Sequence, residues 1–98
     1  MIGKYILPAV RASVAELMKS TYGWRQEDIA DGLGVVQVAV SKYLNEKYSS
    51  DVMKIRNYII KNGLGKEIAR SLSEGRSSSE IHAEIDRLCA SLASSKVL

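Results

Sequence analysis

The sequence predicts an all-α domain. Apolar residues recur at three- and four-residue steps along the 98-residue chain, and no segment shows the strict apolar–polar alternation of a half-buried strand. One proline and seven glycines argue against a turn-rich β fold. The apolar fraction of 46% and the charged fraction of 26% are ordinary for a globular domain and argue against a disordered chain.

Three helices are expected in the first half of the chain, over about 8–21, 26–33 and 37–45. Pro8 suits the first turn of a helix, because the N–H that proline lacks needs no partner there. Gly23 is a plausible left-handed stop for the first helix, and Gly34 closes the second helix in the same way.

Three more helices are expected in the second half, one from Asp51 to the stop at Gly63, one over 66–73 and one over about 78–94. Ser49 or Ser50 caps the first of these. Ser77 and Glu80 have the spacing of a capping box, in which each side chain satisfies a free backbone donor of the other residue.

The two short helices within 26–44 have the features of a closely packed pair. Helices that cross steeply need a small residue at their closest approach, which Ala30 provides, and Gly34 suits a turn that requires positive φ. The apolar contacts between them would come from Ile29, Leu33, Val35, Val40 and Tyr43 or Leu44. This is the arrangement of a helix-turn-helix, which presents its second helix to the DNA major groove.

The pattern Gln-Glu-x-Ile-Ala-x-x-Leu-Gly-Val-x-Gln-x-x-Val-Ser-x-Tyr-Leu over 26–44 resembles the λ repressor/Cro-type (XRE-family) helix-turn-helix. Residues 7–15 also resemble the opening of small archaeal XRE-like predicted regulators, and a weaker likeness extends over 7–47. The resemblance implies a lambda repressor-like helical bundle. It also implies a transcription regulator that binds double-stranded DNA, usually as a dimer.

The resemblance also implies roles at matching positions. Gln26 corresponds to a residue that clamps a DNA phosphate, and Gln37 to the principal base reader, whose amide can bond adenine N6 and N7 together. Val38 would touch a thymine methyl group, or would instead pack against the first helix. Ser41 and Lys42 lie one turn further on, near base edges or the backbone. The plain alternative for Gln37 is a solvated residue at a helix start.

Charge adds further candidates for phosphate contact. These cations are Arg25, Lys42 and Lys47, with Lys54 and Arg11 as weaker candidates, and an ordinary solvated charge is the alternative for each. Three positions depart from the family pattern. Arg25 stands where a capping Ser or Thr is common, Val36 replaces a polar cap, and Gly32 inside a helix should cost up to ~1 kcal/mol relative to alanine.

The chain is expected to divide into a helix-turn-helix domain over 1–64 and a C-terminal helical hairpin over 65–98. In the last helix, apolar residues at steps of four, three and four resemble a short coiled-coil seam. These residues, the expected dimerisation surface, are Ile81, Ile85, Leu88 and Leu92. A homodimer would present two recognition helices about 34 Å apart, one turn of DNA.

Composition restricts the remaining possibilities. The net charge of +3 permits a polyanionic partner without demanding one. With Cys89 as the single cysteine and His82 as the single histidine, we expect no enzyme, metal site or cofactor, and we expect His82 at the surface or an interface. No apolar run approaches the ~18 residues of a membrane span, and residues 1–8 do not form a signal peptide, so we expect a cytoplasmic protein without a membrane partner.

Three other functions remain open at this stage. The same fold serves in protein-interaction modules such as antitoxins or adaptors, and the chain could be an enzyme fragment or a nonspecific chromatin protein. Neither the operator nor any small-molecule effector can be deduced from the sequence.

Overall fold

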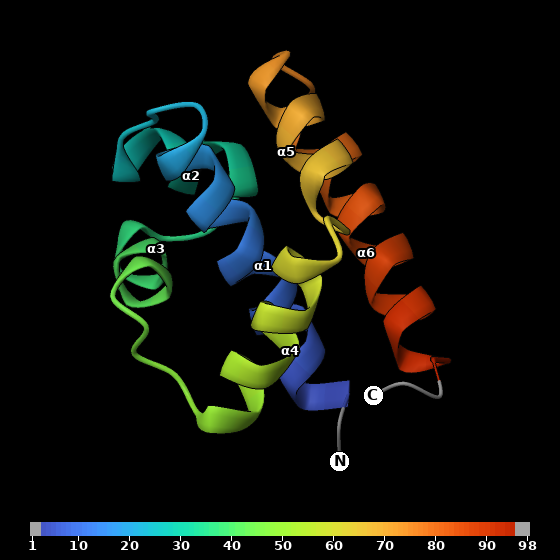
Figure 1. The fold of residues 1–98 in the computed structure, drawn as a ribbon. Coiled ribbons are helices and arrows are strands. Elements are labelled where there is room, and N and C mark those ends of the chain that lie inside the picture. Colours follow the sequence, from blue (N-terminus) through green and yellow to red (C-terminus); the bar gives the residue numbers. More distant parts are fainter. Residues whose placement is uncertain (1–2, 96–98) are drawn as a thin grey trace.

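The computed structural model describes residues 3–95, which form six α-helices and no strand (Figure 1), so the all-α prediction is confirmed. The helices are α1 (Gly3–Ser20), α2 (Gln26–Leu33), α3 (Gln37–Leu44), α4 (Ser50–Lys61), α5 (Lys66–Ser73) and α6 (Ser78–Ala93). Within the described residues, no helix is long and apolar enough to cross a membrane.

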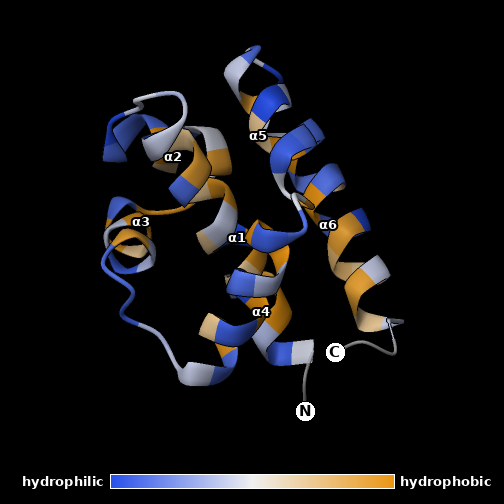
Figure 2. Ribbon diagram, in the orientation of Figure 1, coloured by the Kyte–Doolittle hydropathy of each residue, from blue (hydrophilic) through white to orange (hydrophobic). Residues whose placement is uncertain are grey.

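The other five helices surround α1, with α2 and α3 on one side and α5 and α6 on the other (Figure 1). Small residues make this central position possible, because Ala9, Ala12 and Ala15 are fully buried and let neighbouring helices approach closely. Figure 2 shows that hydrophobic residues face this centre and hydrophilic ones lie outside.

The predicted start of the first helix is wrong by five residues, since α1 begins at Gly3 and contains Pro8 in its interior. A proline there removes one backbone hydrogen bond from the helix. The extra turn nevertheless buries Ile6, which is 2% exposed, and packs Tyr5 against the core. Full burial of a side chain such as that of Ile6 contributes about 1.5–3 kcal/mol, which outweighs the ~0.5–1.5 kcal/mol of one hydrogen bond.

The remaining helices begin and end within one residue of the predicted limits, apart from α4, which ends at Lys61, just before Asn62 and Gly63. Ser49 rather than Ser50 caps α4, and its hydroxyl accepts a hydrogen bond from the Val52 N–H. The capping box of α6 is present, with the Ser77 hydroxyl accepting from the Glu80 N–H.

The helix-turn-helix region and the C-terminal hairpin share one core instead of forming a domain and an appendage. One hydrophobic core contains residues from all six helices, and α6 packs along α1. The radius of gyration of 12.2 Å is close to the ~13 Å expected for one domain of about 100 residues. The predicted hairpin does form from α5 and α6, but it completes the core instead of extending from it.

The predicted dimerisation surface is also wrong. Ile81, Ile85 and Leu92 are 0%, 2% and 4% exposed, and Leu88 is half-buried against the same core. These side chains are covered by the chain's own helices, so they form no exposed seam for a second copy. The apolar stripe of α6 is instead the face with which this helix joins the bundle.

Candidate nucleic-acid interface

A tight turn joins α2 to α3. Gly34 has φ of 68° and ψ of 35°, in the left-handed region that favours glycine. The N–H of Gly34 donates to the Asp31 carbonyl at 3.2 Å, and the N–H of Val35 donates to the Ala30 carbonyl at 3.0 Å. This pair of bonds is a Schellman motif, which ends α2 and fixes the direction in which the chain enters α3.

One face of α3 is held by the core and the other is open to solvent. Val40 is fully buried, and Tyr43 and Leu44 pack against the core from the same face. Gln37 and Lys42 are exposed. Because its inner face packs on α1 and α2, α3 presents a defined outer face instead of moving freely.

The start of α3 carries two exposed residues of the predicted site, Gln37 and Val38. The side chain of Gln37 makes no hydrogen bond to the rest of residues 3–95, so its amide is free to bind. Val38 is 64% exposed, which rules out packing against α1, and Val36 is 71% exposed. An amide beside two exposed valines could contact a base edge and a thymine methyl group.

The C-terminal end of α3 is shaped by a second turn. Glu46 has φ of 57°, and the N–H of Lys47 donates to the Lys42 carbonyl at 2.9 Å. Ser41 is half-buried, and the Asn45 side chain donates to the Ser41 carbonyl at 2.8 Å. Lys42 and Lys47 are both exposed, so this turn places two cations at one end of the helix.

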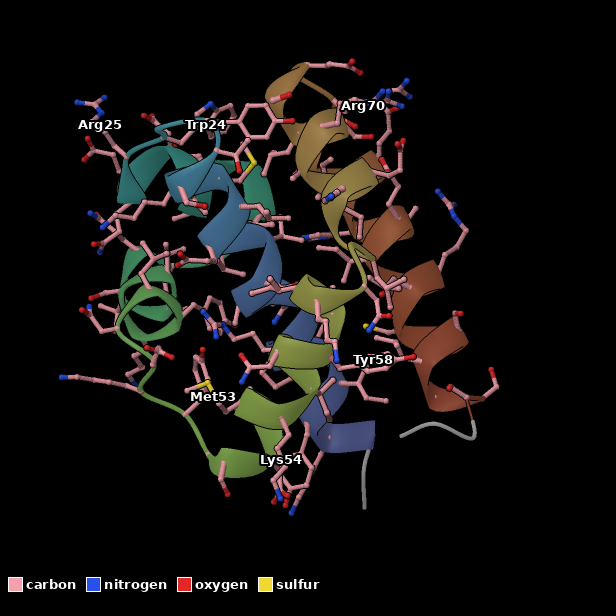
Figure 3. All side chains as sticks on the ribbon, viewed as in Figure 1. Trp24, Arg25, Met53, Lys54, Tyr58 and Arg70 are labelled. Carbon is pink, nitrogen blue, oxygen red and sulfur yellow. The ribbon has the colours of Figure 1, made fainter. Side chains whose placement is uncertain are left out.

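At the start of α2, the two residues predicted to contact phosphate are less available for binding. Gln26 is half-buried. Arg25 projects from the surface beside α2 (Figure 3), but its guanidinium is paired with Glu27 at 3.1 Å and with Asp28 at 3.2 Å. The hydrogen bond that Arg25 donates to Asp28, together with the charge of Glu27, raises the pKa of Arg25. A phosphate would therefore compete with two carboxylates for this side chain.

The weaker cation candidates do not join this surface. Lys54 lies at the far end of the molecule from Arg25 (Figure 3). Arg11 is half-buried on α1, and its Nε atom is buried without a hydrogen-bond partner among the described residues. The cations exposed by the α2–α3 pair and the residues that flank it are therefore Arg25, Lys42 and Lys47.

Two side chains that support this region were not predicted from the sequence. Tyr48, in the turn after α3, packs against the core, and burial raises the pKa of its phenol. Nε2 of His82, on α6, lies 2.8 Å from the Leu33 carbonyl oxygen at the end of α2. The two residues of this second contact are 49 positions apart, so no local pattern could indicate it.

Within residues 3–95, no three His, Cys, Asp or Glu side chains lie together in an arrangement that could bind a metal ion. Cys89 is half-buried, as expected for a small apolar group, and burial raises the pKa of its thiol.

Comparison of the chain with protein-family models, with curated proteins and with solved structures gave no match.

Proposed function

We propose that this protein is a sequence-specific regulator of transcription that binds double-stranded DNA with α3 in the major groove. The observation that carries the proposal is the free amide of Gln37 on the first turn of α3, beside exposed Val38. A helix of eight residues is about 12 Å long, and the major groove is about 12 Å wide. In this position Gln37 reads an adenine and Val38 touches a neighbouring thymine methyl group.

Phosphate contacts then come from the two ends of the helix pair. Lys42 and Lys47 lie at the C-terminal end of α3, and Gln26 and Arg25 lie at the start of α2. Such contacts set orientation and salt dependence but do not read sequence. Arg25 must exchange its carboxylate partners for a phosphate, so its contribution is smaller than that of a free arginine.

A homodimer is part of the proposal, because one helix-turn-helix touches few base pairs and two copies can bind half-sites one turn apart. Since the apolar stripe of α6 is buried in each chain, the two copies must meet through another surface or bind as neighbours on the DNA. A strict monomer by light scattering at tens of micromolar, with and without the selected duplex, removes this part of the proposal.

The test of DNA binding is selection of bound duplexes from a random pool, followed by a salt titration on the winning sequence. We expect the selected duplex to bind at least about 10³-fold more tightly than a scrambled one at physiological salt. The affinity should fall steeply as salt rises. Equal affinity for all duplexes would instead identify a nonspecific binder, and the absence of salt-dependent binding would end the proposal.

A second candidate is a protein-interaction module, which two observations favour. Val36 and Val38 expose apolar surface at the start of α3. Residues 25–48 hold three basic and four acidic side chains, so this segment is slightly negative although the whole chain has a charge of +3. A defined partner that binds wild type and loses binding in Val36→Ser/Val38→Ser would support this candidate if no duplex is selected.

A further inference from the structure

The last carbonyl of α2 is bonded to a side chain from α6. Nε2 of His82 lies 2.8 Å from the oxygen of Leu33. A carbonyl oxygen can only accept a hydrogen bond, so Nε2 carries a proton and donates it. The contact joins the C-terminal hairpin directly to the turn of the helix-turn-helix.

This carbonyl is one that the turn itself leaves without a partner. The final carbonyls of any helix lack intrahelical donors. In α2 the N–H groups of Gly34 and Val35 satisfy the carbonyls of Asp31 and Ala30. The Leu33 carbonyl lies beyond both, and His82 provides its donor.

The imidazole ring also fits closely against Gly34. A Cβ atom at residue 34 would lie 3.0 Å from Nε2 of His82 and 3.1 Å from its Cε1 atom. The positive φ favours glycine here, and any larger residue would also require the ring of His82 to shift slightly. His82 is an exposed residue, and its ring contacts the turn at both Leu33 and Gly34.

Apart from the two backbone bonds of the Schellman motif and half-buried Val35, few contacts hold the start of α3. Val36, the N-cap residue, makes no side-chain capping bond, and the one buried residue of α3 is Val40 in its second turn. Val36 and Val38 are mostly exposed. The Leu33 carbonyl is only four residues before Gln37, so the position of the turn determines where the first turn of α3 points.

We propose that His82 is a positioning residue for DNA reading. Its bond to Leu33 holds the α2–α3 turn and so fixes the direction in which Gln37 is presented. The inference rests on the proposed function for its effect on DNA, but the anchoring itself does not require DNA. It assigns the C-terminal hairpin a part in base discrimination in place of the predicted part in dimerisation.

The test compares three substitutions that differ in where they place a donor. His82→Gln puts its amide nitrogen the same number of bonds from the backbone as Nε2, whereas His82→Asn puts it at the position of Nδ1, too short to reach. His82→Ala removes the donor. Ser91→Ala, at an exposed position on the same helix, is the matched control.

The first measurement is amide hydrogen exchange in the free protein. The probes are Val35 and Ala39, whose N–H groups donate to the carbonyls of Ala30 and Val36. Buried Ile59 on α4 reports global unfolding. We expect exchange at the two probes, relative to Ile59, to rise about twofold to tenfold in His82→Ala and His82→Asn. His82→Gln and Ser91→Ala should stay near wild type.

The second measurement is the ratio of affinities for the selected and the scrambled duplex. His82→Ala and His82→Asn should lower this ratio by about tenfold, with unchanged affinity for the scrambled duplex, and His82→Gln should restore it. Unchanged exchange in His82→Ala, or identical behaviour of the Gln and Asn variants, overturns the proposal. If exchange follows the expected pattern but wild type does not distinguish duplexes, the anchor stands and the proposed function fails.

Discussion

Leu72 on α5 occupies the space that a side chain at residue 32 of α2 would need. A Cβ atom at Gly32 would lie 2.5 Å from Cδ1 of Leu72, which is itself buried in the core. This contact explains why a helix interior contains a glycine despite its cost of up to ~1 kcal/mol relative to alanine. The glycine lets α2, the first helix of the helix-turn-helix, pack closely against the C-terminal hairpin.

Gly32→Ala should therefore destabilise the protein although alanine is the better helix former. Overpacking costs about 1–3 kcal/mol, which exceeds the gain in helix propensity, so we expect a net loss of about 1 kcal/mol. Chemical denaturation of wild type, Gly32→Ala, Leu72→Ala and the double variant gives the coupling between the two positions. Leu72→Ala should cost less when residue 32 is alanine, and additive effects would contradict the steric explanation.

Ile85→Ala should destabilise the monomer and leave its association unchanged. Ile85 is 2% exposed in the core, and truncation of such a side chain to alanine costs about 2–5 kcal/mol. Denaturation measures this loss, and light scattering on the folded variant should give the molar mass of wild type. A variant of lower molar mass with unchanged stability would show that the α6 stripe is a dimer seam after all.

The sequence was sufficient to predict local features such as helices and their apolar faces. It was insufficient to predict the contacts between segments that are distant along the chain. Helical periodicity identified the apolar face of α6, but the same face could bury against a second copy or against α1. The alanines that make α1 a central helix do not indicate which helices pack against them. The early start of α1 escaped prediction for a similar reason, because Ile6 gains its stability from tertiary burial that outweighs the signal of Pro8.

The features of the candidate site likewise divide into local ones, which the sequence predicts, and a long-range contact, which it does not. The turn at Gly34 and the exposed position of Gln37 follow from spacing within 19 residues, and the structure has both. The pairing of Arg25 with Glu27 and Asp28 is also a local feature, because the three residues are close neighbours in the sequence. The His82 contact depends on how the hairpin folds back, and only the packed structure reveals it.

The capping box of α6 should make stability depend on pH. Hydrogen bonds from the Ser77 hydroxyl, from Arg76 and from the Ser77 N–H lower the pKa of Glu80. The folded-state pKa lies below the unfolded one, so this carboxylate stabilises the fold above its ordinary pKa and the contribution is lost as pH falls through the folded value. Glu80→Gln keeps the cap geometry but removes this ionisation.

Thermal unfolding from pH 7 down to about 3 tests this dependence. The stability difference between wild type and Glu80→Gln should be largest at neutral pH and should shrink in acid. Ser77→Ala should lower stability by about 1 kcal/mol at neutral pH through loss of the cap. It should also flatten the acid slope, and a wild-type slope in Ser77→Ala would contradict the assigned cause.

Release of Arg25 from its carboxylates should strengthen DNA binding. The double variant Glu27→Gln/Asp28→Asn removes both carboxylates that pair with the Arg25 guanidinium. The guanidinium can then bind a phosphate without first breaking an ion pair, so we expect several-fold tighter DNA binding. The dependence of affinity on salt should become steeper by about one. Glu74→Gln/Asp86→Asn, just after α5 and on α6, makes the same change in net charge without breaking an ion pair of the described residues, and is the control. Addition of Arg25→Ala should abolish the gain. An equal gain in the control would attribute the effect to net charge alone.

The two kinds of contact proposed for α3 should separate in mutant binding data. Gln37→Ala should cost about 1–3 kcal/mol on the selected duplex and relax preference at one base pair, because only the amide reads a base edge. Lys42→Ala and Lys47→Ala should weaken selected and scrambled duplexes alike and reduce the salt slope by about one each. Binding titrations at several salt concentrations distinguish these outcomes. If Gln37→Ala keeps the wild-type discrimination between duplexes while the lysine variants lose affinity, α3 contacts the DNA backbone without reading sequence at this residue.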